Sequence, residues 1–187
     1  MNDGRKRLSI PVEGPTLRLR LIDPGDAAYL HGLRTDPAYS RHLSTVEGTV
    51  LDQQRWIEAY KHREAAGQEL YFIIERHDDT RCGTVRLYDI GIERFTWGSW
   101  ILDQNKPQKA AVESALLSFG VGFDVLGISL AQLKVHDQNQ HAISFYRRFG
   151  MTEILHFGSE IHFDYPRTRF EADRATYLAI LQNEPRA

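Results

Sequence analysis

One segment carries the clearest candidate for chemistry in this chain. It starts at Asn139, places Ala142, Ile143 and Tyr146 at helical spacing, and closes at Gly150. Since asparagine can cap a helix and glycine can end one, the spacing predicts a helix with Tyr146 on its apolar face. A phenol has a pKa of ~10, and it can protonate a thiolate whose conjugate acid has a pKa of ~8.5 at a cost of ~2 kcal/mol. Tyr146 is therefore a candidate general acid, although an aromatic side chain at this spacing is also typical of a core.

A second segment, upstream of the first, could bind an anion. Pro107 suits the first position of a helix, and apolar residues then recur on one face at positions 112, 115, 116, 119, 123 and 126. The free N–H groups and the positive dipole end of such a helix can hold a pyrophosphate, with Lys106 and Lys109 beside them. Glu113 would place a like charge near the phosphates, costing ~1 kcal/mol in water, unless its side chain turns away. A helix start without a ligand is the alternative.

An aromatic strand precedes this helix. Residues 95–102 read FTWGSWIL, and Gly98 interrupts an otherwise β-rich run. A glycine within a strand often marks a bulge or a close approach of a ligand to the backbone. The alternative is a simple bend filled by Trp97 and Trp100.

Residues 135–151, VHDQNQHAISFYRRFGM, resemble the N-x-x-A-x-x-x-Y-x-x-x-G-F signature of the GNAT superfamily of acetyl-CoA-dependent N-acetyltransferases. Residues 108–113, QKAAVE, occupy the place of that family's Q/R-x-x-G-x-G/A pyrophosphate loop. Only Gln108 matches this second pattern, because Ala111 and Glu113 replace its two small positions. In element order the resemblance extends over residues 16 to 182.

The resemblance implies a role for each matching residue. Tyr146 would be the general acid, and Asn139 would contact the pantetheine arm of acetyl-CoA. The strand around Gly98 would bulge and splay from its neighbour, which frees N–H groups for the acetyl carbonyl. The implied set for acetyl-CoA binding is Trp100, Ile101, Leu102, Gln108, Lys109, Ala110, Ala111, Val112, Glu113, Asn139 and Tyr146.

The general base is not assigned by the sequence. Relatives that acetylate protein amino termini often carry a glutamate just before the strand glycine, where this chain has Thr96 and Trp97. A water relay is one alternative. Side chains that could act instead are Asp89, Glu75, His31 and His42.

Composition excludes several classes of protein. The 187 residues suit a single domain, and 23 basic against 25 acidic residues give no overall attraction to nucleic acid or to a membrane surface. With one cysteine, Cys82, no internal disulfide can form, and the histidines lack metal-ligand spacing. No apolar run is long enough to span a membrane. We therefore expect a cytoplasmic protein without a metal, a monomer or homodimer, with a flexible tail at residues 1–15.

The pattern of elements predicts an α/β fold with a mixed, mostly antiparallel sheet and helices on both faces. Residues 16–22 alternate as a strand, a short helix follows and stops before Pro37, and a loop continues through His42. A longer helix is expected over residues 49–66, then strands at 70–75, 83–89, 95–102, 130–135 and 152–157. Residues 176–181 fit a strand or a short helix, and family order favours a strand.

The leading prediction is transfer of the acetyl group of acetyl-CoA to a small primary amine. Residues 52–56, 71–74, 83–88 and 98–102 are similar to the branch that acetylates 4-amino sugars on nucleotide carriers. Acetylation of protein amino termini and a catalytically silent acyl-CoA-binding module are the alternatives. A sugar nucleotide would need flat apolar faces and cations, for which the candidates are Trp56, Tyr88, Trp97, Arg34, Arg41 and Arg86.

Overall fold

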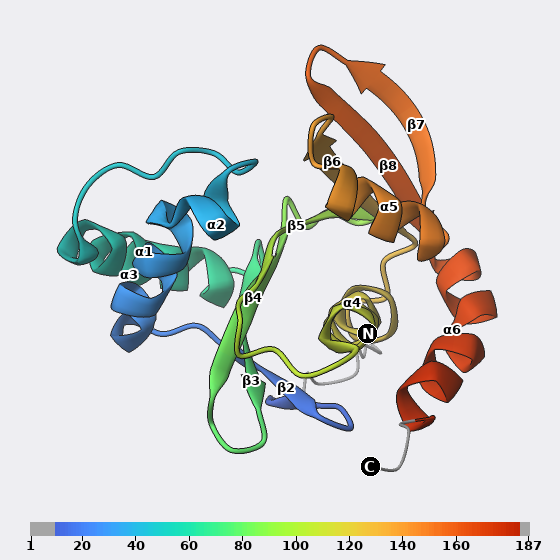
Figure 1. The fold of residues 1–187 in the computed structure, drawn as a ribbon, viewed down its shortest axis with the longest axis horizontal. Coiled ribbons are helices and arrows are strands. Elements are labelled where there is room, and N and C mark those ends of the chain that lie inside the picture. The colour runs from blue at the N-terminus through green and yellow to red at the C-terminus, as the bar shows by residue number, and fades with distance from the viewer. Residues whose placement is uncertain (1–9, 184–187) are drawn as a thin grey trace.

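The computed structural model of the protein describes residues 10–183, which form a mixed sheet with helices on both faces (Figure 1). The strand order is β1-β2-β3-β4-β5-β6-β8-β7, and β5 and β6 run parallel while the other neighbours are antiparallel. This confirms the predicted fold class. The strands are β1 (Val12–Glu13), β2 (Leu17–Leu21), β3 (Leu70–Arg76), β4 (Arg81–Tyr88), β5 (Arg94–Leu102), β6 (Leu130–His136), β7 (Thr152–Phe157) and β8 (Glu160–Pro166).

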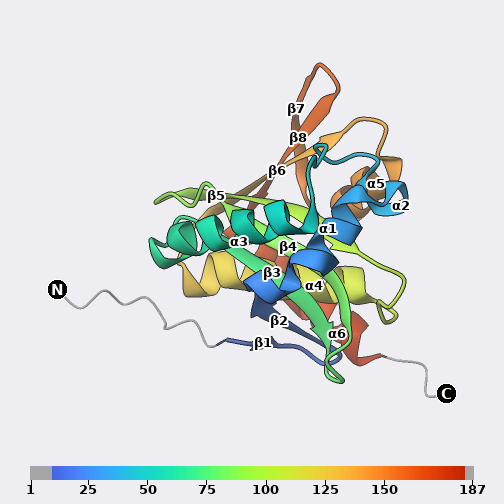
Figure 2. The ribbon, with the colours of Figure 1, turned by 90° about the vertical axis from the view of Figure 1, so that its left-hand side faces the viewer.

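Helices α1 (Ala27–Thr35), α2 (Pro37–Ser40) and α3 (Val50–Ala65) lie on one side of β2–β5, the side that faces the viewer in Figure 2. Ile57 and Tyr60 of α3 pack with Leu30 of α1 against Tyr71 and Ile73 of β3, forming one apolar cluster. Thr49 and Asp52 cap α3 reciprocally, as their spacing predicts. The pairing of α1 with α3 therefore rests on burial, and the start of α3 on hydrogen bonds.

The opposite side of the sheet carries α4 (Ala110–Gly120), a π-helical turn (Val121–Val125), α5 (Gln140–Arg148) and α6 (Arg167–Gln182). Aromatic rings join these helices to one another. Phe119 of α4 lies 5.9 Å from Phe149 after α5, and the Phe149 ring stacks at 4.3 Å on Tyr177 of α6, measured between ring centroids. This larger core fixes the position of α5, and with it the position of Tyr146.

Three expectations about the elements are wrong. Residues 176–181 belong to the 16-residue helix α6 and not to a strand, because Phe170, Tyr177 and Leu181 share one buried face. Residues 37–40 form α2, capped by the Asp36 carboxylate, where a loop was expected. Within the expected tail, Val12–Glu13 pairs with β2, while residues 1–9 lie outside the described residues.

None of the helices within residues 10–183 is long and apolar enough to cross a membrane.

Candidate active site

The predicted irregularity in β5 lies next to Gly98. Opposite β4, Gly98 pairs with Arg86 and Ile101 pairs with Thr84, so that two residues of β5 face one residue of β4. Ser99 adopts a φ of 46°, and its carbonyl accepts a hydrogen bond of 3.0 Å from Thr84 Oγ1. The bulge is confirmed, with Ser99 rather than the glycine in the left-handed conformation.

Strands β5 and β6 pair only over a short stretch. The parallel register joins Arg94 to Leu130 and ends at Thr96 and Gln132. Beyond that point the two strands separate. The later half of β5 therefore has an edge that is not paired with β6, which confirms the expected splay and opens a cavity between the strands.

The cavity at this split, here called the reaction cavity, has a volume of about 470 Å³. Tyr146 of α5 faces it together with the β5 bulge at Gly98 and Ser99. Its ring packs edge-on against Trp97 at 6.0 Å and Phe163 at 5.5 Å, measured between ring centroids. Burial raises the pKa of Tyr146, so the phenol stays protonated but costs more than ~2 kcal/mol to deprotonate toward a thiolate.

A second cavity, the cofactor groove, continues from the first between α2, β5 and α5 and has a volume of about 350 Å³. The two share Trp100, Asn139 and Ala142. Five residues of the expected cofactor set line the groove: Trp100, Ile101, Leu102, Ala111 and Asn139. The groove is also lined by residues that the sequence did not predict: Ala38, Tyr39, His141, Phe145 and Arg148. The basic last turn of α5, which contains Arg148, was a sequence signal for positive charge at this site.

The start of α4 differs from the expectation. The helix begins at Ala110, and Pro107 lies in the preceding turn, because Lys109 adopts a left-handed φ of 63°. Among the described residues, the N–H groups of Ala111 and Val112 donate to no acceptor. A helix start with free N–H groups therefore exists, about one turn later than predicted.

The side chains around this start are arranged differently from the prediction. Lys109 Nζ donates to Asn183 O at the end of α6, at 2.9 Å, so its charge is held away from the groove. Ala110 is buried in the core, Val112 is half-buried, and Gln108 is exposed. The cations that border the groove are Lys106 and Arg148.

Glu113 is the clearest correction to the expected cofactor set. The side chain is 1% exposed and points to β2, where its carboxylate accepts from Thr16 N at 2.7 Å, Thr16 Oγ1 at 2.5 Å and Leu17 N at 2.8 Å. Its own N–H donates to Lys109 O. Glu113 therefore holds the sheet to α4, and its side chain does not face a ligand at this helix start.

The candidate bases separate in space. Glu75 is held by two arginines of β2, and His31 Nε2 contacts Gly48 O. Asp89 borders a different cavity, next to Thr96. His42 alone among the four lines the reaction cavity, with its ring 5.7 Å from that of His136.

Only some of the residues expected to contact a sugar nucleotide line the reaction cavity. Trp97 is 1% exposed and donates to Ser118 Oγ, so it belongs to the core and offers no face to a sugar. Arg34, Arg41 and Tyr88 line the reaction cavity.

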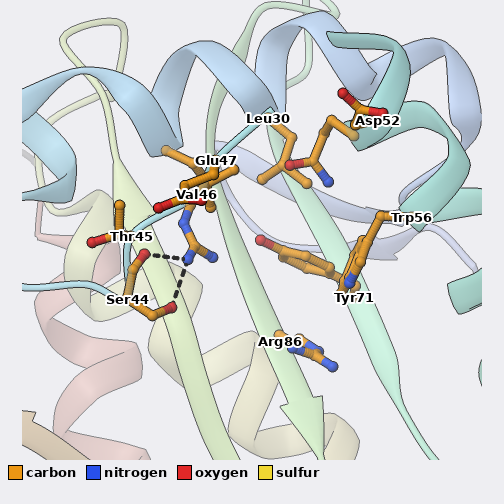
Figure 3. Close-up of a pocket in the computed structure, with 11 residues that line it drawn as sticks. Leu30, Ser44, Thr45, Val46, Glu47, Asp52, Trp56, Tyr71 and Arg86 are labelled. Atoms are coloured by element: carbon orange, nitrogen blue, oxygen red, sulfur yellow. Dashed lines mark hydrogen bonds between the residues drawn. The ribbon is translucent and has the colours of Figure 1, made fainter. Parts of the chain in front are cut away.

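A third cavity, here called the Tyr71 pocket, adjoins the reaction cavity and shares Arg34 and Ser44 with it (Figure 3). Arg86 and Trp56 line this pocket, and Arg86 is already paired with Glu69.

Comparison with known proteins assigns the family. The family profile described as an acetyltransferase (GNAT) domain matches residues 16–152. A solved structure described as apo FdhC, a nucleotide-linked sugar GNAT, is 36% identical, with a TM-score of 0.83 over 91% of this chain and 97% of that chain. No curated protein matches by sequence.

Two more distant structures share the fold. Spermidine N-acetyltransferase from Vibrio cholerae is 18% identical, with a TM-score of 0.73 over 84% of this chain and 99% of that one. A GCN5-related N-acetyltransferase from Brucella melitensis is also 18% identical, with a TM-score of 0.74 over 94% and 87% of the two chains. The family match over residues 16–152 and the 36% identity to the nucleotide-linked sugar GNAT, together with the split sheet, identify this chain as a member of the GNAT family of acetyl-CoA-dependent N-acetyltransferases.

Proposed function

We propose that the enzyme transfers the acetyl group of acetyl-CoA to the primary amine of a nucleotide-linked amino sugar. The observation that carries the proposal is the 36% identity to a nucleotide-linked sugar GNAT over nearly the full length of both chains. The reaction cavity supports it, because Arg41 lines the same space as Tyr146 and can pair with a diphosphate, while Arg34 also borders this space.

The cofactor groove suits acetyl-CoA, which supplies the activated acetyl group as a thioester. The free N–H groups of Ala111 and Val112 can receive the pyrophosphate, and Lys106 and Arg148 add positive charge nearby. Asn139 Oδ1 accepts from Ala142 N at 3.2 Å, which leaves its NH₂ group to donate to the pantetheine amides. The unpaired edge of β5 offers further backbone N–H groups.

The proton transfers would involve residues of the reaction cavity. Tyr146 is the proposed general acid, since its raised pKa keeps the phenol protonated across the working pH range and its ring is fixed by packing. His42 is the proposed base that removes a proton from the acceptor ammonium, because its imidazole lines the same cavity as Tyr146 and histidine is the side chain most often used as a general base. Neither side chain is tied to a hydrogen-bond partner within residues 10–183, so both can address substrates.

The test measures CoA release with a nucleotide-linked amino sugar, the same free amino sugar and a peptide amino terminus. The nucleotide-linked sugar should give the highest kcat/KM. His42→Gln should lower kcat/KM by about 10-fold or more while the Kd of acetyl-CoA stays the same. A peptide amino terminus acetylated fastest would instead favour the alternative function. Unchanged kinetics of His42→Gln would remove the assigned base.

A further inference from the structure

The Tyr71 pocket contains polar groups that the described part of the chain leaves without partners. Its volume is about 470 Å³, and Figure 3 shows the Tyr71 ring extending into it between Trp56 and the loop at Ser44. Tyr71 Oη and Arg34 Nε are both buried without a hydrogen-bond partner. The Gln53 carboxamide, in a residue that is 8% exposed, makes no hydrogen bond within residues 10–183 either. Buried polar groups are nearly always paired, so these two buried atoms, with the Gln53 carboxamide beside them, indicate a ligand.

The charges of this pocket do not favour a phosphate. Arg34 and Arg86 are matched by Glu47 and Asp52 among the lining residues, and Arg86 also pairs with Glu69 at 2.5 Å. The lining is therefore close to neutral. By contrast, Arg41 of the neighbouring reaction cavity has no ion-pair partner among the described residues. Apolar walls complete the Tyr71 pocket, and they come from Leu30, Val46, Trp56 and the ring of Tyr71. A flat, neutral group with hydrogen-bonding edges fits such a site.

We propose that the Tyr71 pocket binds the pyrimidine base of the nucleotide that carries the amino sugar, an inference that rests on the proposed function. Uracil and thymine present two ring carbonyls on either side of an N–H group. Arg34 Nε–H and Tyr71 O–H can donate to carbonyls, and the Gln53 carboxamide can accept from the N–H. Arg34 also borders the reaction cavity, so the diphosphate lies between the two cavities, near Arg41, and the sugar amine lies near Tyr146.

Calorimetry on the full chain tests this assignment with UDP, ADP and pyrophosphate as probes. UDP should bind about 10-fold or more tightly than pyrophosphate and than ADP, because it alone presents the two ring carbonyls. Tyr71→Phe and, separately, Gln53→Leu should each weaken UDP about 3- to 10-fold without changing pyrophosphate binding. Tyr165→Phe is the matched control, since Tyr165 Oη is also buried and unpartnered but lines none of the three cavities.

Two results would overturn the proposal: equal affinity for UDP and pyrophosphate, or an effect of Tyr71→Phe on UDP no larger than that of Tyr165→Phe. Equal binding of UDP and ADP would reject carbonyl recognition. The rates of acetylation of the two sugars show whether only the pocket assignment fails or the proposed function fails as well. If the nucleotide-linked sugar remains the preferred acceptor while UDP shows no selectivity, only the pocket assignment fails. If the free sugar reacts equally well, the proposed function itself fails.

Discussion

Glu113 offers a sharp test of the site, because its two possible roles predict opposite results. As a charge beside the phosphates, it would weaken cofactor binding, and its removal would tighten it. As the buried link between α4 and β2, it should affect folding only. The structure supports the second role through three hydrogen bonds to Thr16 and Leu17.

The expected cost follows from those contacts. A hydrogen bond to a charged group contributes about 1.5–3 kcal/mol, and each buried N–H left without a partner costs about 1–3 kcal/mol, although such values do not simply add. Glu113→Ala strands the N–H groups of Thr16 and Leu17, so we expect a loss of about 3–5 kcal/mol. Glu113→Gln keeps one carbonyl oxygen for the two N–H groups and should lose about 1–2 kcal/mol. Against a typical total of about 5–15 kcal/mol, the alanine variant is severely weakened.

Urea unfolding of both variants measures these losses, and calorimetry measures acetyl-CoA binding to the folded glutamine variant. We expect the urea midpoint to decrease from the wild type to Glu113→Gln and further to Glu113→Ala. The Kd of acetyl-CoA should stay unchanged within about 2-fold for Glu113→Gln. A glutamine variant with wild-type stability and an acetyl-CoA affinity changed by about 10-fold or more would refute the reasoning.

Three further predictions follow from the buried phenols and one ion pair. Tyr146→Phe should lower kcat by about 10²-fold with an unchanged Kd for acetyl-CoA. Because burial raises the Tyr146 pKa, the wild-type phenol stays protonated up to about pH 10, and the wild-type rate should not decrease below that pH through loss of its proton. Tyr71→Phe and Tyr165→Phe each remove a buried hydroxyl without a partner, so neither should lower the Tm in a thermal scan. Burial alone would raise the Asp26 pKa, but the hydrogen bond from Arg20 lowers it overall in the folded protein. The stability that this ion pair contributes is present above about pH 4 and is lost as the pH falls through the pKa of Asp26 in the folded protein. Asp26→Asn should therefore make the free energy of unfolding depend less on pH in the acid range.

Local signals were enough to predict most of the elements. The Thr49–Asp52 spacing located the start of α3, and Gly98 located the bulge, because caps and strand glycines act within a few residues. Helix α6 was harder to predict. Its apolar positions at Phe170, Tyr177 and Leu181 are sparse within a polar segment, and only packing against the core reveals their common face.

The parts of the site that were missed depend on distant contacts. Glu113 meets a partner 97 residues earlier in the chain, a relation that spacing within a helix cannot show. Lys109 takes a left-handed conformation that favours glycine, so the later start of α4 has no sequence signal. In the sequence, Tyr71 is an ordinary aromatic residue of a β-strand. Only the three-dimensional structure shows that its hydroxyl lacks a hydrogen-bond partner.

The most direct test of the account is a competition in one reaction. The enzyme and acetyl-CoA are incubated with a UDP-linked amino sugar, the same free amino sugar and a peptide amino terminus, and mass spectrometry follows acetylation of each. The ratio of products gives the ratio of kcat/KM values. We expect the UDP-linked sugar to be favoured by about 100-fold or more, which corresponds to about 2.7 kcal/mol of added binding in the transition state. Equal acetylation of the free sugar, or faster acetylation of the peptide, would contradict it.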